Sequence, residues 1–344
     1  MTYHLINPIT HPTWNTDIAA FPQATIFHTS LWAKVLQEAY RYQPLYLTKL
    51  DNNEIIAVFP FFHIHSLLTG KRGVSIPFSD YCPPLIKHEI DEAEIHHEIA
   101  RLGRSRNWRY YHVKAWQDVY RSQTPNSSYY LHTIDLSPPL AELKKKCRTN
   151  TRRNIKRANE SGISIQKINS RQGIRIFYEL HCATRRRHGL PPQPIDFFYT
   201  ILNELIYPGF GAVSVAFYRD SPVAANMYFE FNRKALYKYG ASDDEHLEFK
   251  PNDALMWAAI KEYQKRKFRE LSLGKTEMDH DGLRHFKQGW GTEEIKVLDH
   301  KYSFKRDAFV CVSARQTTIP KTLTKLLPQR MLVLFGKLLY RHIG

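Results

Sequence analysis

Positive charge is concentrated in one short segment of the chain. From Lys144 to Arg157, eight of the fourteen residues are Lys or Arg, within the stretch KKKCRTNTRRNIKRANESG. Because close cations repel one another, such a segment favours an anionic partner. Three partners would suit it: a polynucleotide, an anionic membrane surface, or a phosphorylated substrate held in a pocket. A solvated helix face is the alternative that needs no partner.

The composition narrows these possibilities. The chain has 344 residues, a formal net charge of +16 and 43% hydrophobic residues, so two folded domains of ordinary size are expected. The net charge raises the local concentration of any polyanion near the surface. No helix-turn-helix or zinc-finger signature occurs, which argues against sequence-specific DNA binding.

The histidines and cysteines form no recognisable metal or disulfide pattern. The chain has 17 His but no H-E-x-x-H, and its four Cys include no C-x-x-C pair, which indicates a reducing compartment. We therefore expect no metal and no tightly bound cofactor. The chain has neither a signal-peptide pattern nor an apolar run of about eighteen residues, so a cytoplasmic location is predicted.

The elements of the first half are consistent with one α/β domain. Residues 25–40 predict a short strand leading into an amphipathic helix, and residues 43–66 predict a hairpin that turns at Asp51-Asn52-Asn53. A helix over 89–103 and a strand over 110–115 should follow.

The second half begins with a strand over 130–137 and shows a clearer order. The basic segment predicts a helix from Pro139 that breaks near 149–151 and turns its cations outward. The later elements are a strand over 163–168, helices over 171–189 and 195–206, three strands within 212–242, a helix capped by Asn252, and a strand over 269–274. This is the order of an N-acetyltransferase (GNAT) domain, and the first half is similar to a degenerate copy of it.

Several short motifs resemble those of the FemAB-like acyltransferases. In the second half they are R-R-x-I-K-R at 152–157, R-H-G at 187–189, Asn252 with Trp257, and F-K-x-x-W-G at 286–291. F-x-x-x-x-W at 27–32 and SIPFSDY extend the similarity over nearly the whole chain. The resemblance implies an α/β (α+β) fold of two tandem GNAT-like domains, each a mixed, mainly antiparallel sheet flanked by helices. It implies a degenerate domain over 1–130, a catalytic domain over 131–312 and a basic amphipathic tail over 313–344.

Members of this family transfer aminoacyl groups from tRNA to peptidoglycan precursors, or acyl groups to other amines, and some are encoded with exopolysaccharide export systems. The resemblance therefore implies transfer to an amine acceptor, lipid-linked or nucleotide-linked, of the cell envelope, a polysaccharide or peptidoglycan. One alternative is an acyl-CoA-dependent N-acetyltransferase that acts on a small-molecule amine. The other is a non-enzymatic basic protein that binds polyanions or membrane.

The resemblance places Lys287 and Phe286 at the reacting centre. Acyl transfer passes through a tetrahedral oxyanion, which requires a fixed donor or cation. Lys287 matches the lysine of the family's F-K pair and would neutralise the oxyanion or the leaving hydroxyl, while Phe286 would pack beneath the substrate. The alternative is a surface lysine on a short helix. The candidate proton acceptors, besides water or the substrate itself, are Asp243, Asp244, Asp279 and Asp281.

Seven further residues are expected to bind substrate: Arg152, Arg153, Arg187, His188, Tyr239, Asn252 and Trp290. Arg152 and Arg153 would line the donor or acceptor cleft. Arg187 would hold a phosphate, since a guanidinium donates two parallel hydrogen bonds. Helix capping ahead of Gly189 is an equally good explanation of Arg187 and His188.

The acyl donor stays open between acyl-CoA and aminoacyl-tRNA as co-substrate. GNAT enzymes hold the CoA pyrophosphate on a glycine-rich turn before the helix that follows the meander. Here that place reads EFKPNDALMW, without glycine and with Pro251, which lacks an N–H. The coiled-coil arm that tRNA-dependent members often carry is also missing.

The last residues, 321–344, predict a helix after Pro328 with one apolar side and several cations. The apolar side comprises Met331, Leu334, Phe335 and Leu338. Such a helix either docks on a domain or lies on an anionic inner leaflet as a peripheral membrane contact.

Overall fold

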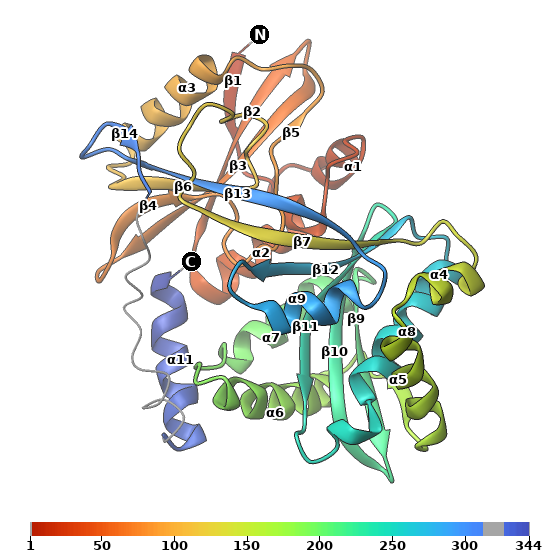
Figure 1. The fold of residues 1–344 in the computed structure, drawn as a ribbon. Helices are drawn as coiled ribbons and strands as arrows, with labels where there is room; N and C mark the ends of the chain where they lie inside the picture. The colour runs from red at the N-terminus through yellow and green to blue at the C-terminus, as the bar shows by residue number, and fades with distance from the viewer. Residues whose placement is uncertain (1, 312–326, 344) are drawn as a thin grey trace. The chain divides into compact units, whose positions relative to one another are not determined.

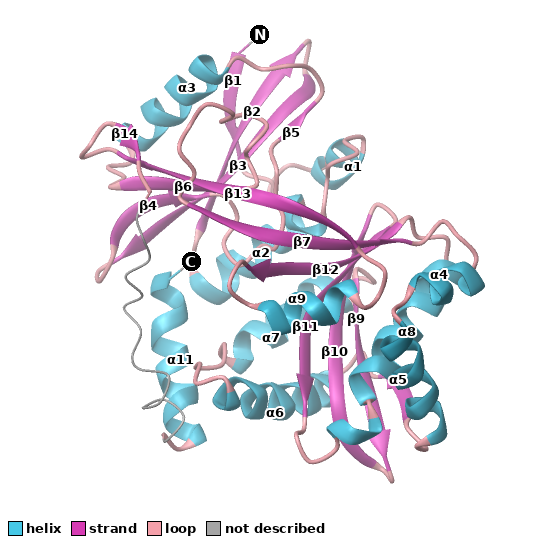
Figure 2. Cartoon of the chain, in the orientation of Figure 1, coloured by secondary structure: helices cyan, strands magenta, loops and turns pink. Residues whose placement is uncertain are grey.

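A computed structural model describes residues 2–311 and 327–343 (Figure 1). These residues form two compact units. The first comprises the described residues up to Tyr129 together with 296–311 and 338–343, and the second comprises 130–295 and 327–337. Each unit combines strands with helices (Figure 2).

The first unit contains a six-stranded sheet with two short additional strands. Its elements up to β6 are β1 (Thr2–Ile6), α1 (Trp14–Ala19), the 3-10 helix η1 (Ile26–His28), α2 (Ser30–Tyr40), β2 (Gln43–Asp51), β3 (Glu54–Ser66), β4 (Gly70–Val74), β5 (Leu85–Ile86), α3 (Glu92–Ser105) and β6 (Tyr110–Lys114). The sheet is completed by β13 (Glu293–Ser303), which carries the short β14 (Ala308–Phe309). Its strand order is β1-β2-β3-β4-β6-β13, antiparallel except for the β4–β6 pair.

Side-chain alternation along β2 divides the core of this unit between the two faces of its sheet. Leu45 and Leu47 belong to the cluster that includes Ile95 of α3, whereas the Tyr46 ring lies 5.5 Å from that of Trp14 in α1. The predicted hairpin is confirmed, because Asn52 and Asn53 both have positive φ in the turn between β2 and β3. The strand expected before α2 is wrong, since that segment forms η1.

The second unit has the element order predicted for a GNAT domain. Its elements are β7 (Ser127–Asp135), α4 (Leu140–Lys146), α5 (Thr149–Glu160), β8 (Ser164–Lys167), α6 (Arg171–Arg187), α7 (Ile195–Ile201), the π-helix η2 (Leu202–Ile206), β9 (Gly211–Tyr218), β10 (Ser221–Phe231), β11 (Lys234–Ser242), the 3-10 helix η3 (Leu247–Phe249), α8 (Pro251–Lys265), β12 (Glu270–Glu277) and α9 (Asp281–Gln288). The strand order is β7-β12-β11-β10-β9-β8. The pairs β8–β9, β9–β10 and β10–β11 are antiparallel, whereas β11 and β12 are parallel.

Helices cover both faces of this sheet. Tyr228 of β10 belongs to the same core as Met256 and Trp257 of α8. Its neighbour Phe229 lies 6.5 Å from the ring of Tyr239, which in turn packs against α6 and α7. Because successive strand residues face opposite ways, α8 lies on one face and α6 with α7 on the other.

The basic segment forms two helices rather than one. Cys147 and Arg148 are extended, so α4 ends at Lys146 and α5 starts at Thr149, slightly before the predicted break. The cap predicted at Asn252 is wrong: Lys250, with φ +59, is the N-cap of α8, and Pro251 is its first residue.

The helix predicted after Pro328 is α11 (Gln329–Ile343). Leu332, Gly336 and Tyr340, spaced four residues apart, are buried on one side. No helix in the described ranges has both the length and the apolar character needed to cross a bilayer.

Candidate active site

Two neighbouring strands of the second unit part from each other at their carboxyl ends. Parallel β11 and β12 pair only through Lys234↔Glu270, Ala235↔Leu271 and Leu236↔Ser272. Both strands then continue, to Ser242 and Glu277. Beyond Leu236↔Ser272, the register shows no further pairing between these two described strands.

Lys287 is held at the point where these strands part. Its side chain is 3% exposed, and its Nζ donates to the carbonyl oxygens of Gly274 (2.9 Å) and Lys275 (2.8 Å) on β12. In a regular strand successive carbonyls point in opposite directions, but Gly274 has φ +70, which allows both to face the ammonium. The surface-lysine alternative is therefore wrong.

A buried histidine lies near Lys287. His132 of β7 is fully buried, and its Nδ1 is 3.6 Å from Oε2 of Glu294. Burial lowers its pKa to about 4, with a further lowering from the charge of Lys287. His132 is therefore neutral near pH 7, and its Nε2 has no hydrogen-bond partner among the described residues.

Arg284 fixes the carboxylate beside that histidine. The guanidinium of Arg284 donates two hydrogen bonds to Glu294, at 2.9 and 2.6 Å, and lies 3.9 Å from the centroid of the Tyr130 ring. These hydrogen bonds lower the pKa of Glu294, with help from Gln288. The site thus contains an ionised carboxylate, a neutral imidazole and a buried ammonium.

The basic helices pack against the segment that carries Lys287. The backbone N–H of Arg148 donates to the carbonyl of Gly289 (2.9 Å), and its side chain donates to Oε1 of Gln288 (3.0 Å). Gly289 and Gly291 allow this approach, because a Cβ at either position would lie within 3.0 Å of Thr151 or Lys146. Helices α4 and α5 therefore help to position α9.

The predicted substrate-binding cations of α5 face solvent. Arg152 and Arg153 donate to Thr149 and Asn150 of their own helix, both at 3.1 Å. Neither forms an ion pair with a described carboxylate, so both keep their full charge toward solvent.

Arg187 and His188 lie at the end of α6. The guanidinium of Arg187 forms an ion pair with Asp244, in the loop after β11. The backbone N–H of His188 donates to Thr184 (3.2 Å), and Gly189 follows with φ +66. This is an ordinary glycine-terminated helix end, as the capping explanation requires. Phosphate binding by Arg187 stays a prediction.

The three aromatic residues predicted for the site are parts of packed cores. The Tyr239 ring packs among Phe177, His181 and Phe198. Trp290 is 2% exposed, and its ring lies 6.3 Å from that of the half-buried Phe286. Both support the helix that carries Lys287.

Polar residues at the start of α8 leave little place for an anion. Asn252 is half-buried in the first turn, next to the buried Asp253, whose pKa burial raises. Asn154 of α5 donates to that carboxyl (3.3 Å). A helix N-terminus that already contains a carboxyl group is less favourable for a pyrophosphate.

The aspartates considered as proton acceptors have other surroundings. Asp243 contacts His246 (2.7 Å) and Asp244 pairs with Arg187, while Asp279 and Asp281 are exposed. His132 and Glu294 were not found by sequence reasoning. They are far apart in the chain, and neither belongs to a motif.

Comparison with known proteins supports the fold. A protein-family model described as "Acetyltransferase (GNAT) domain" matches residues 145–288. No curated protein matches the sequence significantly.

Solved structures extend the likeness to most of the chain. The structure of FemX is 13% identical, with a TM-score of 0.70 over 89% of this chain and 98% of that one. A tandem GNAT protein from the clavulanic acid biosynthesis pathway is 9% identical (TM-score 0.57; 88% and 98% covered). The C-terminal domain of a protein named as a lysylphosphatidylglycerol synthetase from Agrobacterium fabrum is 12% identical (0.55; 83% and 89%).

These likenesses confirm the resemblance inferred from the motifs. The order of elements in the second unit agrees with this resemblance. The chain has a FemAB-like tandem GNAT fold, and its residues 145–288 match the model described as "Acetyltransferase (GNAT) domain".

Proposed function

We propose that this protein is an N-acyltransferase that moves an acyl or aminoacyl group onto an amine of a cell-envelope precursor. The observation that carries the proposal is the buried ammonium of Lys287 at the point where β11 and β12 part. A fixed cation in a site shielded from water stabilises an oxyanion without reorganisation at the moment of reaction.

In this proposal the donor carbonyl lies near Lys287 Nζ. The acceptor amine attacks the carbonyl carbon, a C–N bond forms, and the bond to the leaving sulfur or oxygen breaks. His132 is neutral, its Nε2 has no partner in the described part of the chain, and it is the proposed acceptor of the amine's proton. Glu294 would stabilise the resulting imidazolium.

Acyl-CoA is the donor that the GNAT fold favours. Its pantetheine arm would lie where β11 and β12 part, next to Lys287. Because Lys250, Pro251 and Asp253 replace a glycine-rich turn, we propose that cations elsewhere hold the CoA phosphates. Aminoacyl-tRNA is the alternative donor, and the exposed cations of α4 and α5 are the feature that would favour it.

The acceptor is proposed to be reached at a membrane. On α11, Met331, Leu334, Phe335 and Leu338 are between 45% and 64% exposed, although the opposite side of the helix is buried. Arg330, Lys337 and Arg341 are also exposed. An apolar stripe with adjacent cations is suited to the interface of an anionic leaflet, where a lipid-linked amine would be found.

Incubation of the full chain with acyl-CoAs or charged tRNA tests this function. Each donor would be combined with lipid-linked, nucleotide-linked and small-molecule amines, and the products would be identified by mass spectrometry. An amide product that depends on the protein supports the proposal, and a product formed only with small amines would restrict it to the N-acetyltransferase alternative. Binding of polyanions without any acyl transfer would instead favour the non-enzymatic alternative.

A further inference from the structure

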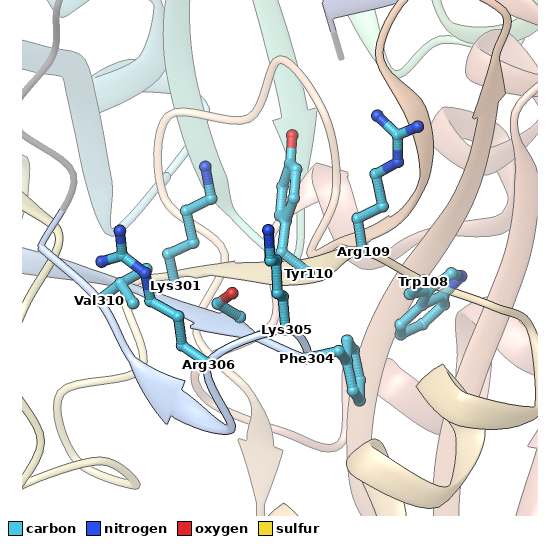
Figure 3. Close-up of a pocket in the computed structure, with 9 residues that line it drawn as sticks. Trp108, Arg109, Tyr110, Lys301, Phe304, Lys305, Arg306 and Val310 are labelled. Atoms are coloured by element: carbon cyan, nitrogen blue, oxygen red, sulfur yellow. The ribbon is translucent and has the colours of Figure 1, made fainter.

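The first unit contains a cationic pocket that acyl transfer does not require. It has a volume of about 680 Å³ and lies where β6, β13 and the turn after β13 meet (Figure 3). Its described lining includes the cations Arg109, Lys301, Lys305 and Arg306 but no Asp or Glu. We call it the β6–β13 pocket.

The register of the sheet brings these cations together. Ser303 of β13 pairs with Tyr110 of β6, and the N–H of Phe304 donates to the carbonyl of Arg109 (3.1 Å). Lys301 lies two residues before Ser303 and therefore on the same face. The N–H of Arg306 donates to Ser303 (3.2 Å), so the chain turns back and places Lys305 at the rim. In Figure 3 the side chains of Arg109, Lys301 and Lys305 extend to the same side.

The charge of the pocket is not balanced from within the described chain. None of its four cations forms an ion pair with a described carboxylate, whereas Arg101 and Arg104 in the same unit pair with Glu98 and Asp307. The half-buried Lys301 lies beside a further cation, Arg72, which is 2% exposed. Burial and the charge of Arg72 lower the pKa of Lys301, so an anion placed here would relieve both effects.

The remaining walls are mainly aromatic. Trp108 is buried with its indole N–H donated to His63 (2.7 Å), and Phe304 packs against the core. The ammonium of Lys301 lies 4.0 Å from the centroid of the Tyr110 ring. A ligand that fits these walls combines an apolar part with a concentrated negative charge.

Phosphate is the group that best matches the rim. A phosphate monoester carries a charge of about −1.5 to −2 near pH 7 and offers three acceptor oxygens. Arg109 and Arg306 can each donate two hydrogen bonds to such a group, while the lysines act as point charges. A single carboxylate would leave most of the cationic charge uncompensated.

We propose that the β6–β13 pocket binds the phosphate groups of a ligand whose apolar part rests on Trp108 and Phe304. This inference does not depend on the proposed acyl transfer. The phosphate can belong to a nucleotide-linked molecule or to a lipid headgroup, and the same pocket chemistry serves both.

Calorimetric titration of the full chain at about 150 mM salt tests the proposal, since salt at this level screens diffuse charge. The probes are inorganic pyrophosphate, uridine diphosphate and dihexanoyl phosphatidate, with dihexanoyl phosphatidylcholine as a control for the apolar part. We expect saturable binding of at least one organic phosphate, at least tenfold tighter than that of pyrophosphate. Tighter binding of uridine diphosphate identifies a nucleotide source, and tighter binding of phosphatidate identifies a lipid source.

The matched variants separate the pocket from the net charge. Arg109→Gln with Lys305→Gln should weaken binding at least tenfold, because both side chains are exposed at the rim. Arg101→Gln with Arg121→Gln removes the same charge from exposed positions outside the pocket and should change binding less than twofold. Should the first pair fail to fold, Lys305→Gln alone provides the test, with at least threefold weakening expected.

Three results would overturn the proposal: no saturable binding by any phosphate probe at millimolar concentration, equal weakening by the two pairs of substitutions, or equal binding of phosphatidylcholine and phosphatidate. Unchanged melting temperatures of the variants exclude an indirect effect of unfolding.

Discussion

Replacement of Lys287 by Met tests the proposed reacting centre most directly. Met keeps an unbranched apolar stem of similar volume but removes the ammonium that donates to Gly274 and Lys275. The structure therefore predicts two separable effects, one on stability and one on turnover.

The effect on stability follows from the two carbonyls. A buried polar group left without its partner costs about 1–3 kcal/mol. Removing a charge that is costly to bury offsets part of this. We expect a net loss of about 1–3 kcal/mol, which corresponds to a decrease in Tm of about 2–4 °C per kcal/mol for a unit of this size.

The effect on turnover should be larger. Loss of one fixed donor to an oxyanion typically lowers kcat by a factor of about 10² to 10³. The assay measures release of the donor's leaving group together with amide formation, at a temperature well below Tm, so that nearly all of the variant is folded. Lys275→Met is the matched control, because that side chain is only half-buried and pairs with Glu277 (2.9 Å).

A third measurement does not depend on activity. Burial is the main cause of the lowered pKa of His132, and the charge of Lys287 lowers it further. Lys287→Met should therefore raise that pKa above about 4, as followed by an NMR titration, while burial keeps it below its ordinary value of 6.5. Turnover within threefold of the wild-type value would refute the catalytic assignment. An unchanged pKa of His132 would refute the electrostatic coupling on which the proposed proton transfer depends.

Three further predictions address the surroundings of the site. Gly274→Ala should lower the unfolding free energy by about 1–2 kcal/mol, because φ is +70 at this position. It should also lower turnover, since the carbonyls that hold Lys287 would be misplaced. Turnover equal to that of the wild type would contradict this prediction. Burial lowers the pKa of His181 to about 3, so between pH 6.5 and 3 the unfolded state binds a proton that the folded state does not. The unfolding free energy should therefore decrease with falling pH, by up to about 1.4 kcal/mol per pH unit. In urea unfolding, the unfolding free energy of His181→Gln should depend less steeply on pH. Leu334→Ser with Phe335→Ser should weaken binding to phosphatidylglycerol vesicles at least tenfold. The control pair Leu67→Ser with Leu68→Ser, which is also exposed, should not weaken it. Equal weakening by the two pairs would place any membrane contact elsewhere.

The spacing of apolar residues predicted most elements of the fold, because it reflects which side chains of one helix or strand are buried. The meander over β9, β10 and β11 and the hairpin of β2 and β3 follow from alternation and turn residues. Two boundaries were wrong where backbone conformation overrode composition. Lys250 adopts a left-handed conformation that is uncommon for residues other than glycine, and the segment before α2 forms a 3-10 turn.

The candidate site was predicted only where a motif carried it. Lys287 stands out through F-K-x-x-W-G, whereas His132, Arg284 and Glu294 are brought together by a strand, a helix and the start of another strand. No local sequence pattern predicts that these residues lie close together, because the sequence around each of them contains no motif. The parting of β11 from β12 is likewise a property of two strands and not of either sequence.

The packing of α4 and α5 explains the position of the basic segment but not its charge. Leu143, Cys147, Ile155 and Ala158 are buried, so the cations face outward because the opposite side is needed for the core. A solvated helix face ordinarily carries charges of both signs. Within the described residues, only Lys156 and Arg157 of these eight cations form an ion pair with a carboxylate, at 3.7 and 3.8 Å. Folding requires the apolar side alone, so it does not account for the remaining positive charge on helices that also position α9. We propose that this charge serves an anionic donor or acceptor that binds beside Lys287.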